Sequence, residues 1–149
     1  MGVINMAKTI KEIHPKYVVC FKVGKFYNVY GKDAYILAYM FSYKINFVEN
    51  NIPTCGFPLE KLPKATATME KKKINYILID TRNSYDIDEK SDNKNLNTYD
   101  EMFEKSHRII RAKTRIEKIV EKLIEEVEKE GFKEKIKKVE EIVYETGKV

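Results

Sequence analysis

The chain has 149 residues, of which 43% are hydrophobic and 34% are charged, so it can form one domain of ordinary size or a small domain with a helical appendage. No segment approaches the roughly 18 consecutive apolar residues that a membrane span needs, and the first residues lack the features of a signal peptide. Two isolated cysteines, Cys20 and Cys55, lie in apolar surroundings and are typical of buried thiols in a reducing compartment. We therefore expect a cytoplasmic protein with no metal site.

The net charge of +5 is unevenly distributed along the chain. Residues 1–80 contain 12 Lys and Arg against 6 Asp and Glu, whereas residues 98–149 contain 13 of each kind. An excess of basic charge favours polyanionic partners such as nucleic acid. The first 80 residues are therefore the part in which we expect to find such a contact.

Residues 17–80 alternate between β-rich apolar segments and helix-like segments. The pattern predicts, in chain order, a strand at 17–22, a turn at Gly24 and Lys25, a strand at 26–30, a helix at 33–42, a strand at 44–48, an extended segment at 52–58, a helix at 59–73 with Pro63 no later than its first turn, and a strand at 74–80. This order indicates an α+β fold, a mixed β-sheet with two or three packed helices, in a domain covering residues 1–80.

Two further segments follow this domain. Residues 81–97 are polar and rich in Asn, Asp and Ser, which predicts a linker or an irregular excursion. Residues 98–149 have helical periodicity, with a capping-box pattern at Thr98 and Glu101 and a helix-ending Gly131, and we expect a helical hairpin. Its apolar face either packs on the α/β domain or on itself, or it serves as an arm for dimerisation or for docking a protein partner.

Motifs for catalysis or cofactor binding are not found in this pattern. The chain has no phosphate-cradling glycine loop, no GxSxG and no HExxH, and His14 and His107 have no neighbouring group that would make a catalytic pair. We expect a protein that is not an enzyme and that uses no cofactor.

Residues 10–80 contain a series of motifs at a characteristic order and spacing, at Gly24, Phe26, Tyr27, Tyr30, Asp33, Ala34, Ile52, Pro53, Gly56 and Pro58. This series resembles the N-terminal mismatch-recognition domain of the MutS family of DNA repair proteins. The resemblance covers about half of the chain and does not extend to residues 98–149, which contain nothing like the family's ATPase, lever, core or clamp domains.

The resemblance implies a DNA-probing role for the segment GKFYNVYG at residues 24–31. In the family, a Phe enters the minor groove at a mispaired base and a Glu two positions later hydrogen-bonds that base. These positions are Phe26 and Asn28 here, so an uncharged amide replaces the carboxylate, and Lys25 replaces an Asp. We expect phosphate contacts from Lys22, Lys25 and Lys44, and tighter but less discriminating binding than a mismatch sensor would show.

An alternative interpretation treats Phe26 as an ordinary strand residue packed in the core. Because side chains alternate along a strand, either Phe26 or Tyr27 should face inward, and the resemblance implies Tyr27. Three functions are consistent with these observations. The protein could bind distorted or mismatched duplex DNA, it could be an accessory of a larger nucleic-acid machine such as a reverse-transcriptase retroelement, or it could be a protein-interaction module that has lost DNA binding.

Overall fold

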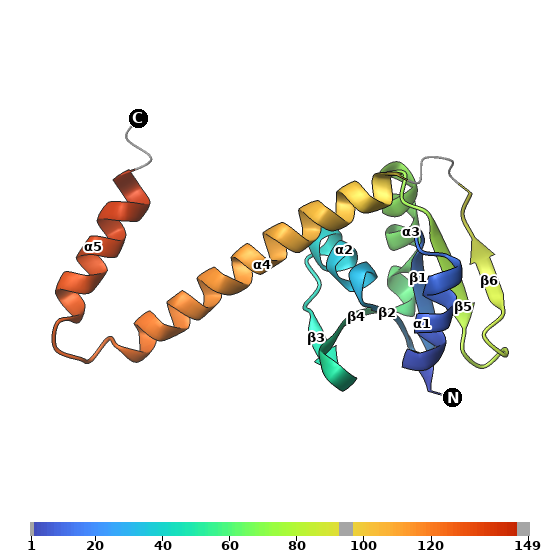
Figure 1. Cartoon of the computed structure of the whole chain (residues 1–149), viewed down its shortest axis with the longest axis horizontal. Coiled ribbons are helices and arrows are strands. Elements are labelled where there is room, and N and C mark those ends of the chain that lie inside the picture. The colour runs from blue at the N-terminus through green and yellow to red at the C-terminus, as the bar shows by residue number, and fades with distance from the viewer. Residues whose placement is uncertain (1, 93–96, 146–149) are drawn as a thin grey trace. The chain divides into compact units, whose positions relative to one another are not determined.

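A computed structural model describes residues 2–92 and 97–145 (Figure 1). The chain divides into two compact units, residues 1–110 and residues 111–149. Within the part of the chain that is described, no helix is both long and apolar enough to cross a membrane. The two units are built in very different ways.

The first unit contains a six-stranded mixed sheet. Its elements are α1 (Val3–Ile13), β1 (Val18–Val23), β2 (Phe26–Tyr30), α2 (Lys32–Phe41), β3 (Asn46–Val48), β4 (Ile52–Pro58), α3 (Leu62–Lys71), β5 (Tyr76–Asp80), β6 (Ile87–Lys90) and the first part of α4 (Asn97–Glu125). The strand order is β3-β4-β2-β1-β5-β6; among the described strands, β1 and β5 pair in parallel and the other neighbours pair antiparallel. The predicted α+β class with a mixed sheet and packed helices is confirmed.

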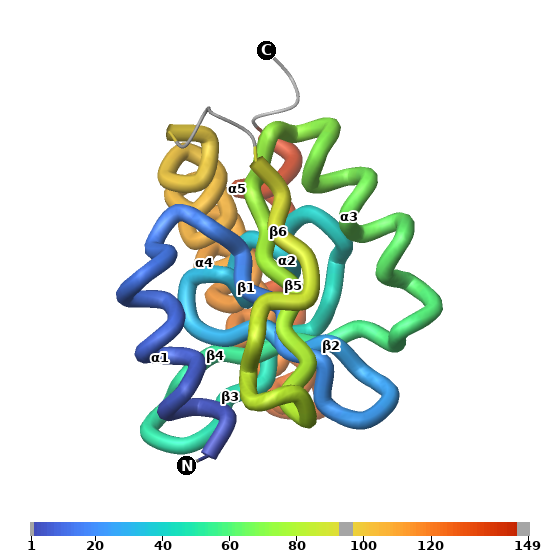
Figure 2. Tube along the Cα trace, turned by 90° about the vertical axis from the view of Figure 1, so that its right-hand side faces the viewer, coloured from blue at the N-terminus to red at the C-terminus, as the bar shows by residue number. Residues whose placement is uncertain are grey.

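Each face of the sheet has its own hydrophobic cluster. On one face, α2 and α3 contribute residues such as Leu37 and Met69, and the start of α4 contributes Tyr99. On the other face, α1 packs through Ala7 against apolar side chains of β1 and β5. In Figure 2, α1 and α3 accordingly lie on opposite sides of the strands. Alternating side chains on β1 serve both clusters, which makes β1 the centre of the fold.

A buried carboxylate links four elements of this unit. Asp33, at the start of α2 and only 2% exposed, accepts hydrogen bonds from Lys11 Nζ at 2.7 Å, from the Tyr99 hydroxyl at 2.5 Å and from the Val19 N–H at 3.0 Å. Burial lowers the pKa of Lys11, while the charge of Asp33 acts in the opposite direction. Burial and then the Asp33 charge raise the pKa of Tyr99. This cluster fixes α1, β1, α2 and the start of α4 relative to one another.

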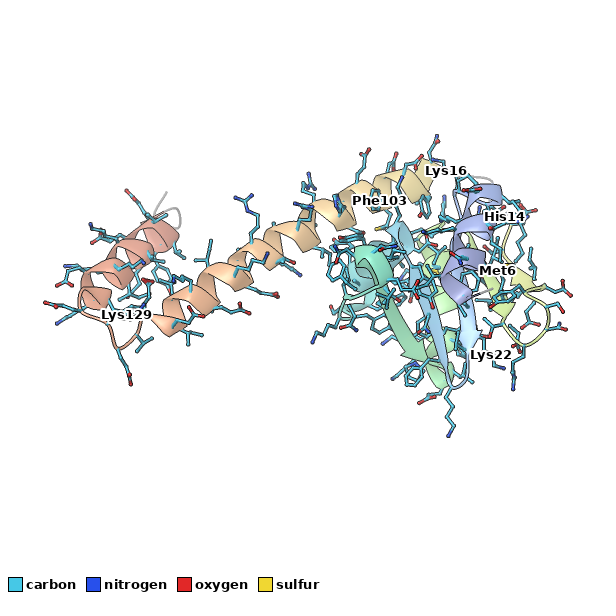
Figure 3. The ribbon with its side chains drawn as sticks, turned by 60° about the horizontal axis from the view of Figure 1, so that its bottom comes forward. Met6, His14, Lys16, Lys22, Phe103 and Lys129 are labelled. Carbon is cyan, nitrogen blue, oxygen red and sulfur yellow. The ribbon has the colours of Figure 1, made fainter. Side chains whose placement is uncertain are left out.

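A second ion pair joins the same chain regions at the surface. Lys16, which follows α1, contacts both carboxylate oxygens of Asp100 at 2.6 and 2.7 Å. Figure 3 shows Lys16 beside the start of α4, with Phe103 further along that helix. Both partners are about half exposed, so this pair contributes much less to stability than the Asp33 cluster.

The predicted elements agree with the structure within a few residues, and the strand at 26–30 and the extended segment at 52–58 have the expected bounds. The helix expected at 59–73 is split into a 3-10 turn at Leu59–Lys61 and α3, with Pro63 in the first turn of α3. The β3 strand begins at Asn46 instead of residue 44, after Ser42 has adopted a left-handed conformation that ends α2.

Two elements were not predicted. The α1 helix has no side-chain cap at Gly2 and no acidic residue in its first turn, so its start carries no sequence signal. The β6 strand lies inside the segment expected to be an irregular linker, and it pairs with β5 although all four of its residues are exposed. Its backbone hydrogen bonds, and not burial, place it in the sheet.

The second unit consists of the distal part of α4 and α5 (Phe132–Glu145). Gly131, with a φ of +86°, lies in the connection where a helix end was expected. Tight packing of the two helices as a hairpin stays a prediction. The unit boundary falls near residue 110 and not between residues 80 and 98, because Tyr99 and Ser106 on α4 are buried in the first unit.

Candidate functional site

The candidate site begins at the hairpin between β1 and β2. Gly24 has a φ of +61°, which favours glycine, and it forms a two-residue turn with Lys25. Phe26 follows directly and is 51% exposed, whereas Tyr27 is 5% exposed and stacks on Phe57 of the core. The prediction that Tyr27 faces inward is confirmed, and the alternative of Phe26 as a core residue is wrong.

Asn28 points to the same face of the sheet as Phe26, because the two residues are separated by one position on β2. It lies opposite Gly56 of β4, and a Cβ built on that glycine would collide with Asn28 Oδ1 and lie 3.1 Å from the Tyr27 carbonyl oxygen. A hydrogen bond also joins Asn28 to the Tyr30 side chain and opposes the increase in the Tyr30 pKa that burial causes. The Asn28 amide is therefore held over a glycine by its neighbours.

This part of the sheet is open to solvent among the described residues. By strand alternation, Thr54, Gly56 and Pro58 of β4 share the face of Phe26 and Asn28. Gly56 is exposed and the other two are half-buried, whereas the same face of β1 and β5 is covered by α1. On this face of β2 and β4, Phe26 is the large apolar side chain that is exposed among the described residues, next to Asn28, Gly56 and Pro58.

Two of the three predicted lysines are exposed, and neither of them forms an ion pair within the described structure. Lys25 lies in the turn next to Phe26, and its carbonyl oxygen accepts a hydrogen bond from the Leu59 N–H at 3.1 Å, which fixes the turn backbone. Lys44 is exposed two residues before β3, the edge strand next to β4. The structure thus brings Lys25 beside Phe26 and Asn28 and leaves Lys44 at the sheet edge.

Lys22 is placed differently. It pairs in register with Tyr27, so its side chain starts from the sheet face opposite Phe26. Its Nζ lies 4.0 Å from a carboxylate oxygen of Asp80 on β5 (Lys22 is labelled in Figure 3). The backbone N–H and then the side chain of Arg82 lower the pKa of Asp80, and Lys22 adds to this effect. A phosphate contact from Lys22 stays a prediction, and it would have to compete with Asp80.

Sequence reasoning did not identify the contribution of α1 to this region. A cavity of about 540 Å³ lies between α1, the sheet and the start of α2, and Tyr30 lines it together with three lysines, Lys8, Lys11 and Lys32. Tyr30 is thus part of the cavity wall and at the same time a hydrogen-bond partner of Asn28. The apolar spacing of Val3, Ile4, Ala7 and Ile10 on α1 was the available signal, since it matches one face of a helix.

No group of three or more His, Cys, Asp or Glu that could hold a metal ion occurs within residues 2–92 and 97–145. Cys20 and Cys55 are free and buried, as predicted. Burial raises the pKa of Cys55 to about 12, so this thiol stays protonated at neutral pH.

Comparison with known proteins supports the resemblance that the motifs indicate. No curated protein matches the chain. The family model of MutS domain I matches residues 1–85, which is more than half of the chain and includes α1, the β1–β2 hairpin, α2, β4, α3 and β5. The matched segment contains the open sheet face with Phe26, Asn28 and Gly56. The chain therefore belongs to the MutS domain I family.

Proposed function

We propose that the first unit binds duplex DNA through the open face of β2 and β4, and that Phe26 acts as a wedge between stacked bases. The observation that carries this proposal is a half-exposed phenylalanine on a backbone fixed by a tight turn and two strand partners. Leaving half of this ring in water forgoes roughly 1 kcal/mol of burial energy. A contact with a nucleobase would recover it.

The wedge selects DNA by deformability. Partly unstacking a base step costs a few kcal/mol, and less where the step is mismatched or damaged. Stacking of a base on an aromatic ring returns about 1–3 kcal/mol. The net free energy, which is the cost of unstacking plus the gain from stacking on the ring, is most favourable at a base step that is already distorted. A preference for distorted duplexes therefore needs no recognition of the base sequence.

The neighbouring residues reduce this preference. Asn28 can donate and accept a hydrogen bond at a base edge, but it has no negative charge to repel phosphates of an undistorted duplex. Lys25 attracts those phosphates and is exposed next to Phe26. With acidic residues at positions 25 and 28, the protein would bind perfect duplex more weakly relative to mismatched duplex. We infer that Lys25 and Asn28 reduce this difference in affinity between the two duplexes.

The site is proposed to bind DNA without catalysing a reaction. One wedge and a few lysine contacts correspond to dissociation constants of about 10⁻⁴–10⁻⁶ M at physiological salt, in the range of non-specific binding. We infer a non-catalytic binding protein whose single site is weak, and which gains affinity from a second binding site.

Fluorescence anisotropy with labelled oligonucleotides tests the proposal. We expect Phe26→Ala to weaken binding of single-mismatch duplex by about 1–3 kcal/mol, roughly 5- to 150-fold, and to weaken perfect duplex less. Phe47→Ala is the matched control, because Phe47 is 60% exposed but lies on β3 at the sheet edge. Equal losses for the two variants would end the wedge proposal and leave only attraction of charge.

Two further probes in the same titration separate the alternatives. Preference for an RNA–DNA hybrid over both DNA duplexes would favour an accessory role in a reverse-transcribing machine. If no probe, including single strand, bound in a salt-dependent manner, the protein-interaction module would be the better account.

A further inference from the structure

The cavity beside α1 is separate from the proposed DNA contact. It measures about 540 Å³, within the range of roughly 300–1,000 Å³ that is typical of pockets for small molecules. Tyr30, which lines the cavity, ends β2, whereas Phe26 begins that strand. Four residues of strand place their Cα atoms about 13 Å apart. The cavity therefore offers room for a ligand of its own.

Apolar side chains form the interior of the cavity. Val19 and Phe21 of β1, each 1% exposed, belong to its lining. Ile4 of α1 and Ile52 of β4 contribute to the same surface. Such a surface offers few hydrogen-bond partners to a sugar or a peptide, and burying their polar groups there is costly. The ligand that fits this interior has an apolar body.

The charged groups around the cavity are basic in excess. Lys8 and Lys32 lie at exposed positions of its lining, and neither forms an ion pair with another described residue. Lys11 is deeper, and its Nζ lies 2.7 Å from a carboxylate oxygen of Asp33. The lining contains three lysines against two carboxylates, Glu12 and Asp33, which leaves an excess of one positive charge. An anionic group on the ligand would balance it.

The excess charge acts on the buried Lys11. Burial lowers the pKa of Lys11, Asp33 opposes this effect, and Lys32 lowers the pKa further by repulsion. The Lys32 Nζ lies 5.0 Å from the centre of the Phe103 ring, so this ammonium acts on the cavity from a distance. Lys8 is the direct partner for an anion, and a negative charge beside it would also offset the repulsion between Lys11 and Lys32.

We propose that the cavity binds a small organic monoanion with an apolar body, such as an aryl carboxylate or sulfonate, whose body packs against Val19 and Phe21 and whose charge lies beside Lys8. A neutral apolar molecule would leave the excess positive charge unpaired, and a polyphosphate would bring more negative charge than this excess balances. The inference stands on the cavity alone and does not depend on which ligand the open face of β2 and β4 takes.

Two fluorescent probes with the same apolar body test the proposal on the full-length chain. 1-Anilinonaphthalene-8-sulfonate carries one anionic group, whereas N-phenyl-1-naphthylamine lacks it. We expect the sulfonate to bind with a dissociation constant of about 10–100 µM. Lys8→Glu with Lys32→Glu should weaken binding of the sulfonate about 5- to 30-fold and change the affinity for the amine by less than about twofold.

The matched control is Lys64→Glu with Lys71→Glu, which makes the same change of charge at two exposed positions of α3, on the other side of the sheet. It should leave the affinity for both probes unchanged, and circular dichroism should show native helix content in both variants. Equal weakening of sulfonate binding in the two variants would overturn the proposal, because general attraction of charge would then explain the binding. Equal weakening of both probes by the cavity variant would also overturn it, because the anionic group would then have no partner there.

Amide chemical shifts locate the sulfonate on the native chain, so they decide the position of the site even if the cavity variant unfolds. We expect saturable shifts at Ala7 and Gly31, which line the cavity, and none at Ala65, which is buried on α3. Shifts confined to residues 111–145 would show that the exposed apolar side chains there bind the probe, and would overturn the proposal. So would the absence of saturable binding below about 1 mM.

Discussion

The two units of this protein use their apolar residues in opposite ways. Residues 1–110 pack apolar side chains on both faces of a sheet and bury one carboxylate in a network of three donors. Residues 111–145 present large apolar side chains to solvent on two helices. The difference indicates that the first unit is stable through its own core, whereas the described residues of the second leave large apolar side chains uncovered.

The same contrast holds on a smaller scale within the first unit. Tyr27 and Phe26 are adjacent on β2, yet one completes the core and the other is half exposed. Strand alternation alone places one of the two outward, but it does not require an aromatic residue there. An exposed aromatic on a rigid hairpin is therefore informative in the same way as the exposed Ile116 and Ile119 of α4, because these side chains are left uncovered by the described residues of their own units.

The largest expected effect concerns the buried charge of the first unit. Asp33→Ala should lower its free energy of unfolding by about 3–5 kcal/mol, because Lys11 loses its buried ion-pair partner and the Tyr99 hydroxyl and Val19 N–H lose an acceptor. Asp100→Ala is the control. It removes a half-exposed pair with Lys16 and should cost at most about 1 kcal/mol in the same denaturant titration. Similar losses for both would show that the Asp33 network is not a stabilising centre.

A matched pair of truncations compares the two units directly. Leu37→Ala should destabilise the first unit by about 2–5 kcal/mol, since Leu37 is fully buried. Ile119→Ala should change the same unfolding transition by less than about 0.5 kcal/mol, because Ile119 is 58% exposed and outside that unit. If Ile119→Ala destabilised the first unit as strongly as Leu37→Ala, the two units would share one core.

Alkaline pH should weaken the first unit selectively. The Cys55 thiol has a pKa of about 12 when folded against 9.0 for the free side chain, so the folded state retains a proton that the unfolded state releases. The contribution of this protonated thiol to the free energy of unfolding is complete below pH 9.0 and is lost as the pH rises towards 12. At pH 10 the loss amounts to about 1 kcal/mol.

Urea unfolding at pH 8 and pH 10 measures this effect, and Cys55→Val should reduce the difference between the two values. The second unit contains no cysteine, so its helix content should change less over this range. A pH difference that is identical in Cys55→Val would assign the effect to other groups, such as Tyr99, whose pKa is also raised by burial.

The smallest expected effects are those of replacing single lysines on DNA binding, and they differ between Lys25 and Lys22. Lys25→Ala should weaken duplex binding modestly and reduce the slope of log affinity against log salt by about 1, because one phosphate contact is lost. Lys22→Ala should change the slope less, since Lys22 is already near Asp80.

Asn28→Glu should weaken binding to perfect duplex more than to mismatched duplex. An unchanged ratio between the two would contradict the role assigned to the missing charge.

Much of the first unit could be predicted from its sequence because hydrophobic alternation and turn residues determine it locally. The β2 strand, the inward Tyr27 and the proline at the start of α3 are of this kind. The α1 helix has an amphipathic spacing but no capping signal to mark its start, and β6 is held by backbone pairing alone, so its sequence carries no burial pattern. The separation of Lys22 from Lys25 depends on strand register, and the unit boundary inside α4 depends on which of its turns are buried.

The central claim is that Phe26 contacts a base, and photo-cross-linking tests it most directly. A duplex carrying 5-iodouracil at the mismatch would be irradiated with the native chain, digested with trypsin and analysed by mass spectrometry. Cleavage after Lys25 and Lys32 isolates the peptide FYNVYGK, residues 26–32. We predict that the cross-link lies on this peptide at Phe26 and is lost from it in Phe26→Ala, with Phe47→Ala unchanged. A cross-link on any other peptide, persisting in Phe26→Ala, would show that the base is held elsewhere.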